Sequence, residues 1–146
     1  MSIGITPLLD YEKLDAIAEK FSTPYQQASP FPHIALDDFL APMLIEKLLK
    51  KFPTLKEKPG QNSDIAKTDD GKLPQPNKLW LSNQIGVDAI FRHLYWELNS
   101  APFLAFLEKL TGIANLIPDP HMAGGGVHQT LRDGLLMIHA DFNKHP

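Results

Sequence analysis

The sequence predicts an α+β protein in which several helices precede a sheet that begins near the end of the chain. Apolar residues recur at helical spacing between about residues 10 and 112. From Ile113 onward, residues typical of strands and turns replace that pattern. An Asp-Gly pair at 133–134 then divides two strand-like runs, which is the pattern of a tight hairpin. Helices followed by strands are typical of the α+β class.

The first two expected helices have recognisable ends. Asp10 is a favourable N-cap for the first helix, and Pro24 is expected to end it. Pro42 stands at a favourable first position of the second helix, which Pro53 closes. Each helix has one apolar face, formed by Leu14, Ile17, Ala18 and Phe21 in the first and by Leu44, Ile45, Leu48, Leu49 and Phe52 in the second.

Two further helices complete the helical part, which spans about residues 10–112. The third is expected over residues 84–98, and the fourth follows Ser100 and ends at Gly112, a favourable C-terminal cap. Residues 33–36 resemble a short strand between proline and aspartate residues. Residues 56–78 are polar and rich in proline and glycine, so we expect one long surface loop there, which can also act as a lid.

The composition limits the classes of protein to which the chain can belong. Its 146 residues suit a single domain spanning residues 1–146, and 43% hydrophobic with 21% charged residues indicates a globular chain. The net charge of −3 favours no nucleic-acid partner. No basic start with an apolar run indicates a signal peptide, and no apolar stretch reaches the roughly 20 residues that cross a membrane. We therefore expect a cytoplasmic protein, and without cysteine it has no disulfide or thiolate metal site.

The closing hairpin brings together the residues of the candidate site. If Asp133 and Gly134 occupy the two central positions of a type I′ turn, His128 lies opposite His139. Directly opposite residues share a face of the strand pair, and side chains alternate along each strand. One face is therefore expected to hold Met137, His139 and Asp141 from the second strand and His128, Thr130 and Arg132 from the first.

The spacing of His139 and Asp141 lets one imidazole and one carboxylate reach a single metal ion. Two polar residues without a ligand role would give the same pattern, so the spacing alone leaves both interpretations open. His128 is the favoured third donor, with His121 and His145 as further candidates, and hydrogen bonding to a ligand or exposure to solvent is the alternative for each. Thr130, Arg132 and Met137 are the candidates for residues that face a substrate or cosubstrate.

Three stretches of the chain resemble the prolyl-4-hydroxylase-like family of 2-oxoglutarate- and Fe(II)-dependent oxygenases. They read FPHIALDDFLAPMLIEKLLKKFP, LEKLTGIANLIPDPHMAGGGVHQ and GLLMIHADFNKHP, and together they cover most of the chain from about Pro30. The resemblance implies N-terminal helices packed on the first strands of a double-stranded β-helix, a jelly-roll or cupin-like fold whose core begins over about residues 113–146. It also implies Fe(II) held by His139 and Asp141.

The activity implied by the resemblance is a dioxygenase reaction. Such enzymes use 2-oxoglutarate as cosubstrate, some with ascorbate, and hydroxylate a C–H bond of a peptidyl-proline, an amino acid or another small molecule. The family pattern continues with further strands, a second histidine ligand and a basic residue that pairs with 2-oxoglutarate, whereas this sequence stops at Pro146. We therefore expect a truncated or incomplete form, or the leading part of a longer enzyme.

Two alternatives to an oxygenase follow from the same residues. One is a folded fragment without catalytic activity, because the second histidine ligand and the basic residue are missing from the pattern. The other is a zinc-binding structural hairpin, since zinc accepts the same donors as iron. The unpaired edge of the expected sheet also predicts a homo-oligomer, because an exposed edge is a template for pairing with another chain.

Overall fold

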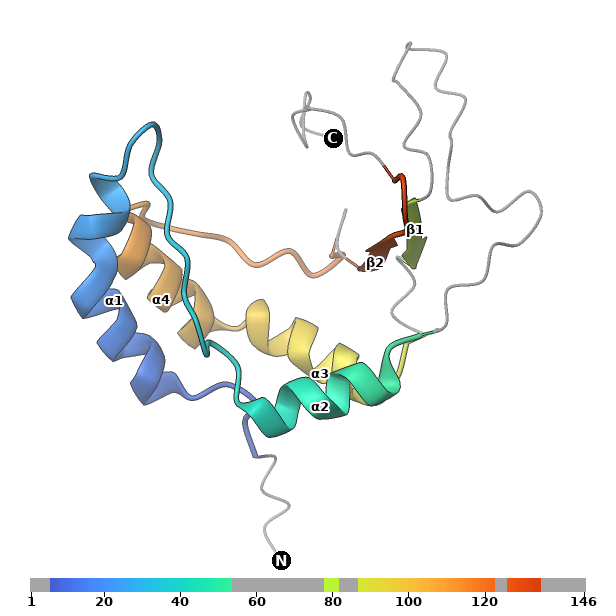
Figure 1. Cartoon of the computed structure of the whole chain (residues 1–146). Coiled ribbons are helices and arrows are strands. Elements are labelled where there is room, and N and C mark those ends of the chain that lie inside the picture. The colour runs from blue at the N-terminus through green and yellow to red at the C-terminus, as the bar shows by residue number, and fades with distance from the viewer. Residues whose placement is uncertain (1–5, 54–77, 82–86, 123–125, 135–146) are drawn as a thin grey trace, which may run out of the picture. The chain divides into compact units, whose positions relative to one another are not determined.

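The computed structural model describes residues 6–53, 78–81, 87–122 and 126–134 (Figure 1). In chain order the elements are α1 (Tyr11–Gln26), α2 (Pro42–Lys51), β1 (Lys78–Leu81), α3 (Ala89–Leu98), α4 (Ala101–Thr111) and β2 (Val127–Thr130). The chain divides into two compact units. The helical unit comprises residues 1–52 and 87–123, and the strand unit comprises residues 53–86 and 124–146.

Helices α1 and α4 form the main packing of the helical unit and lie side by side in Figure 1. Their facing sides contribute buried apolar residues at helical spacing, which is why both segments are stable as helices. The buried core consists of Leu9, Leu14, Ala18, Leu94, Phe106 and Leu110. On the surface, Lys109 of α4 reaches Glu19 at 3.0 Å and Asp15 at 3.3 Å, and these hydrogen bonds and charges raise the pKa of Lys109.

Helix α1 begins as the sequence predicts but runs further. The Asp10 side chain accepts a hydrogen bond from the Lys13 amide at 3.0 Å, which confirms it as the N-cap. Pro24 lies inside the helix, which continues to Gln26, so the prediction that Pro24 ends it is wrong. A proline removes the hydrogen bond from its own position to the carbonyl four residues earlier and crowds that carbonyl; only Tyr25 and Gln26 follow it here, so this cost falls on the last turn of the helix.

The other three helices start and stop largely where their capping residues predict. Pro42 is the first residue of α2, and Ser100 and Gly112 cap the two ends of α4, Gly112 with a left-handed φ of 78°. Asp88 caps α3 by accepting from the Ile90 amide at 3.1 Å, so α3 begins later than the predicted residue 84. The Ile90 amide, and after it Lys51 at 3.2 Å, lower the pKa of Asp88.

The strand unit contains one antiparallel pair, in which β1 is hydrogen-bonded to β2. Its register places Trp80 opposite His128 and Lys78 opposite Thr130. Strand β1 was not predicted, and its first residue, Lys78, is the last residue of the predicted long loop. That loop otherwise lies at residues 56–77, outside the described residues.

The predicted fold class is wrong. The described residues form four helices and one short strand pair, so the structure is mostly helical and is not a double-stranded β-helix. Residues 33–36 form no strand. In the expected start of the β-helix core, residues 113–122 are irregular because Pro118 and Pro120 have no amide to donate and Asn115 and Met122 have positive φ. Within the described part of the chain, no helix is long and apolar enough to cross a membrane.

Candidate functional site

The strand and turn expected before His139 are present in the described residues. Val127–Thr130 forms β2, and the Gly134 amide then donates to the Leu131 carbonyl at 3.0 Å, which closes a tight turn. A strand and a tight turn thus lie in the predicted region, but β2 is hydrogen-bonded to β1, a pairing that was not predicted. The second strand of that hairpin, with Met137, His139 and Asp141, lies outside the described residues, as does His145.

The turn is displaced by one residue from the predicted position. Its ends are Leu131 and Gly134, so the two central residues are Arg132 and Asp133, with Asp133 at a left-handed φ of 61°. Aspartate tolerates this conformation better than most residues, and glycine is common at the last position of a turn. The expectation that His128 lies opposite His139 assumed Asp133 and Gly134 at the centre. The observed turn removes the basis for that register.

The remaining candidate residues lie along β2 and its turn. His128 and Thr130 are exposed on the strand at alternate positions, and Arg132 is exposed in the turn. His121 belongs to the helical unit, where its amide donates to the Asp119 side chain at 2.9 Å. In the described ranges, no three metal-ligating side chains come close enough together to hold an ion.

The donors outside those ranges are chemically suited to iron. His139 offers an imidazole nitrogen and Asp141 a carboxylate oxygen, which are two of the three donors in the His₂-carboxylate set of non-haem Fe(II) enzymes. The predicted third donor, His128, lies within the described residues on β2. The donor chemistry of these residues therefore fits Fe(II), and it also fits zinc.

A buried carboxylate that the sequence analysis missed stands on α3. Glu97 is only 7% exposed, and its two oxygens accept from the Leu8 amide at 2.7 Å and the Leu9 amide at 2.8 Å. His93, one turn earlier, contacts the same carboxylate at 2.8 Å. Glu97 thereby fixes the segment that enters α1. It shares the apolar face of α3 with buried Phe91 and Leu94, and a charged residue at that spacing was the available signal.

A second polar contact at the end of α3 holds the loop before β2. The Asn99 side chain accepts from the Asp119 amide at 3.0 Å and donates to the Asp119 carbonyl. The Asn99 amide nitrogen also lies 3.8 Å from the Met122 sulfur. Because one side chain satisfies both backbone groups of Asp119, it replaces the pairing that a neighbouring strand would otherwise give. Asn99 therefore fixes residues 119–122 against the helical unit.

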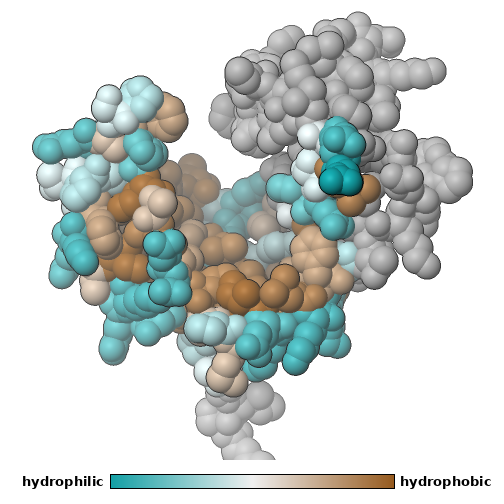
Figure 2. Space-filling view, viewed as in Figure 1, coloured by the Kyte–Doolittle hydropathy of each residue, from teal (hydrophilic) through white to brown (hydrophobic). Residues whose placement is uncertain are grey.

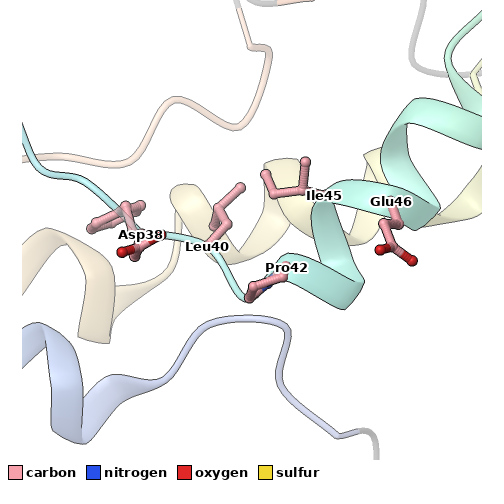
Figure 3. A pocket seen from close by; sticks show the side chains of 6 residues that line it. Asp38, Leu40, Pro42, Ile45 and Glu46 are labelled. Carbon is pink, nitrogen blue, oxygen red and sulfur yellow. The ribbon is translucent and has the colours of Figure 1, made fainter.

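A shallow groove of about 610 Å³ lies at the start of α2 (Figure 3). Its floor is apolar. Among the residues labelled in Figure 3, Asp38 and Glu46 lie at the two ends, so a carboxylate stands at each end of the groove. The lining residues are Asp38, Phe39, Leu40, Pro42, Ile45 and Glu46. An apolar floor with acidic ends suits a ligand that has an apolar body and a cationic group.

Comparison with known proteins adds no relative: no protein-family model, curated protein or solved structure matches the chain.

Proposed function

We propose that the chain belongs to a 2-oxoglutarate- and Fe(II)-dependent dioxygenase of the prolyl-4-hydroxylase-like kind, with His139 and Asp141 as iron ligands. The observation that carries the proposal is the run from Leu107 to Pro146, which resembles that family over its whole length and contains the His-Ala-Asp motif. The donor chemistry of the motif agrees with the resemblance, because imidazole and carboxylate are the ligands of this class of iron site.

The described part of the chain supports the proposal at two points. Strand β2 and the turn at 131–134 lie just upstream of His139, so a strand and a chain reversal precede the motif as the resemblance implies. Asp119 lies in the same run of sequence, and its contact with Asn99 gives the loop before β2 a fixed anchor. The support is local and does not depend on a double-stranded β-helix.

In the proposed site, the chain's own residues bind and orient. His139 and Asp141 hold the metal, and His128 is the candidate third donor. Arg132 would attract the anionic cosubstrate, while Thr130 and Met137 would face the cosubstrate or the substrate, a small molecule or a peptidyl-proline. When bound, Fe(II) would supply the centre at which O₂ serves as the oxidant, with 2-oxoglutarate giving two electrons as it is converted to succinate and CO₂ and the C–H bond that is hydroxylated giving the other two.

The test is an anaerobic titration of the 146-residue chain with Fe(II) and 2-oxoglutarate, read as the visible metal-to-cosubstrate charge-transfer band. We expect the band to appear and to be lost in His139→Ala and in Asp141→Ala. His33→Ala is the matched control, because the His33 ring lies in the helical unit and hydrogen-bonds the Phe31 carbonyl at 2.8 Å. A band that survives both ligand substitutions would refute the assignment of these two residues.

The same experiment separates the two alternatives. A folded chain that gives no band and retains no metal would favour a non-catalytic module. Zinc that stays bound through dialysis, with no charge-transfer band after iron is added, would favour a structural zinc site. Loss of the band in His128→Ala, with helical content unchanged by circular dichroism, would identify the third donor.

A further inference from the structure

Helix α2 has an exposed apolar stripe in addition to its buried face. Leu44 is buried and Leu48 packs against the core, whereas Ile45 is 40% exposed, Leu49 68% and Phe52 36%. Positions 45, 49 and 52 are one turn apart and lie on one side of the helix. Figure 2 shows apolar side chains gathered along this part of the helical unit with hydrophilic ones beside them. A soluble chain rarely leaves such a row uncovered without a partner.

Charged residues of opposite sign flank the two ends of this stripe. Glu46 stands near its start, beside the groove that Ile45 also lines. Lys50 and Lys51 stand near its end, where Lys51 pairs with Asp88 at 3.2 Å and Lys50 is exposed. The apolar stripe thus runs from an acidic end to a basic end. Such a surface is complementary to itself when a second copy is turned end for end.

We propose that α2 is a dimerisation surface whose partner is α2 of a second copy of this chain, packed antiparallel about a two-fold axis near Leu49. This arrangement places Ile45 of each copy beside Phe52 of the other and brings Glu46 near Lys50 of the other. The contact between Glu46 and Lys50 therefore forms twice, because a two-fold interface repeats every contact.

The stripe contains few residues, so the dimer is weak, with a dissociation constant on the order of tens of micromolar. Sedimentation equilibrium over about a hundredfold range of chain concentration measures it directly. Leu49→Lys places a charge at the centre of the stripe and weakens the dimer at least about tenfold. Met43→Lys is the matched control: Met43 is 70% exposed on the opposite side of the same helix, and its substitution leaves the dissociation constant unchanged.

Charge reversal tests the antiparallel arrangement. Glu46→Lys or Lys50→Glu alone sets like charges against each other and weakens the dimer about threefold to tenfold. The double variant Glu46→Lys/Lys50→Glu restores the original dissociation constant to within about twofold. Circular dichroism of each variant shows that the helices are retained.

Three results would overturn the proposal. One is a chain that stays monomeric over the whole concentration range. Another is a dimer that persists in Leu49→Lys, which would place the contact elsewhere, for example at a strand edge. The third is a double charge reversal that fails to recover what the single reversals lose, because that excludes a pairing of Glu46 with Lys50.

Discussion

Replacing Glu97 by alanine tests how much one buried carboxylate contributes to the free energy of unfolding by fixing residues 8–9, directly before α1. The substitution removes the acceptor for the Leu8 and Leu9 amides, which lie at 2.7 and 2.8 Å from its oxygens. Leu9 is buried, so water does not readily replace the lost partner of its amide. The contact with His93 is also lost, but that side chain is 28% exposed and can be hydrated instead.

The expected cost follows from the two amides. A buried donor left without an acceptor costs roughly 1–3 kcal/mol, so Glu97→Ala is expected to lower the free energy of unfolding by about 3 kcal/mol. Part of this loss is offset because the carboxylate itself no longer has to be desolvated. Glu97→Gln keeps the shape and one carbonyl acceptor, so it should lose about half as much.

Urea unfolding followed by circular dichroism measures these values, and hydrogen exchange at Leu8 and Leu9 locates the loss. The control is Glu12→Ala, an exposed acidic residue in the first turn of α1 whose removal is expected to cost below about 1 kcal/mol. The reasoning is refuted if Glu97→Ala costs no more than Glu12→Ala, or if exchange at Leu8 and Leu9 stays as slow as in the original chain.

Three further substitutions have expected outcomes that the same unfolding measurements check. Gly112→Ala should destabilise the chain by about 1–2 kcal/mol, because Gly112 has a φ of 78° and an added Cβ would lie 3.2 Å from the Gln26 side chain; an unchanged stability would contradict this. Asp88→Asn should lose stability near neutral pH, and its difference from the original chain should shrink as the pH falls below about 4. The reason is that the lowered pKa of Asp88 gives stability above its ordinary value of 3.8, which is lost as the carboxylate is protonated; a constant difference would show that its charge is not involved. Asn99→Ala should cost about 1–3 kcal/mol and speed hydrogen exchange at the Asp119 amide, whereas slow exchange there would show that another group holds the loop.

Helix boundaries could be predicted from the sequence because they are set by local chemistry. Asp10, Pro42 and Ser100 each favour a helix start, and Gly112 favours a stop, whatever the rest of the chain does. Pro24 was misjudged because the position of a proline within the last turn depends on where the helix would otherwise end. Contacts with the rest of the unit extend to the last turn of α1, where Tyr25 packs against the core and the Gln26 side chain donates to the Leu110 carbonyl at 3.4 Å.

The strand pairing could not be predicted because it joins distant segments. The KLWL run of β1 is too short to show a period of two, and its partner β2 lies more than forty residues further on. The Asp-Gly pair correctly indicated a tight turn at residues 131–134. It did not fix which residues lie at the centre, because aspartate can take the left-handed position by itself. A shift of one residue changes which side chains face one another. The predicted pairing of His128 with His139 assumed a turn centred on Asp133 and Gly134, so it no longer follows.

The two polar contacts that the sequence analysis missed share one turn of α3. Glu97 holds the backbone before α1, and Asn99, two residues later, holds the backbone at Asp119. The two segments that they hold lie close to the two ends of the helical unit's sequence, at residues 8–9 and 119–122. Such contacts give no periodic signal, since a single glutamate or asparagine serves each one. They nevertheless satisfy backbone groups that no strand or helix satisfies, so these two irregular segments are held by side chains at the end of α3 rather than by a sheet.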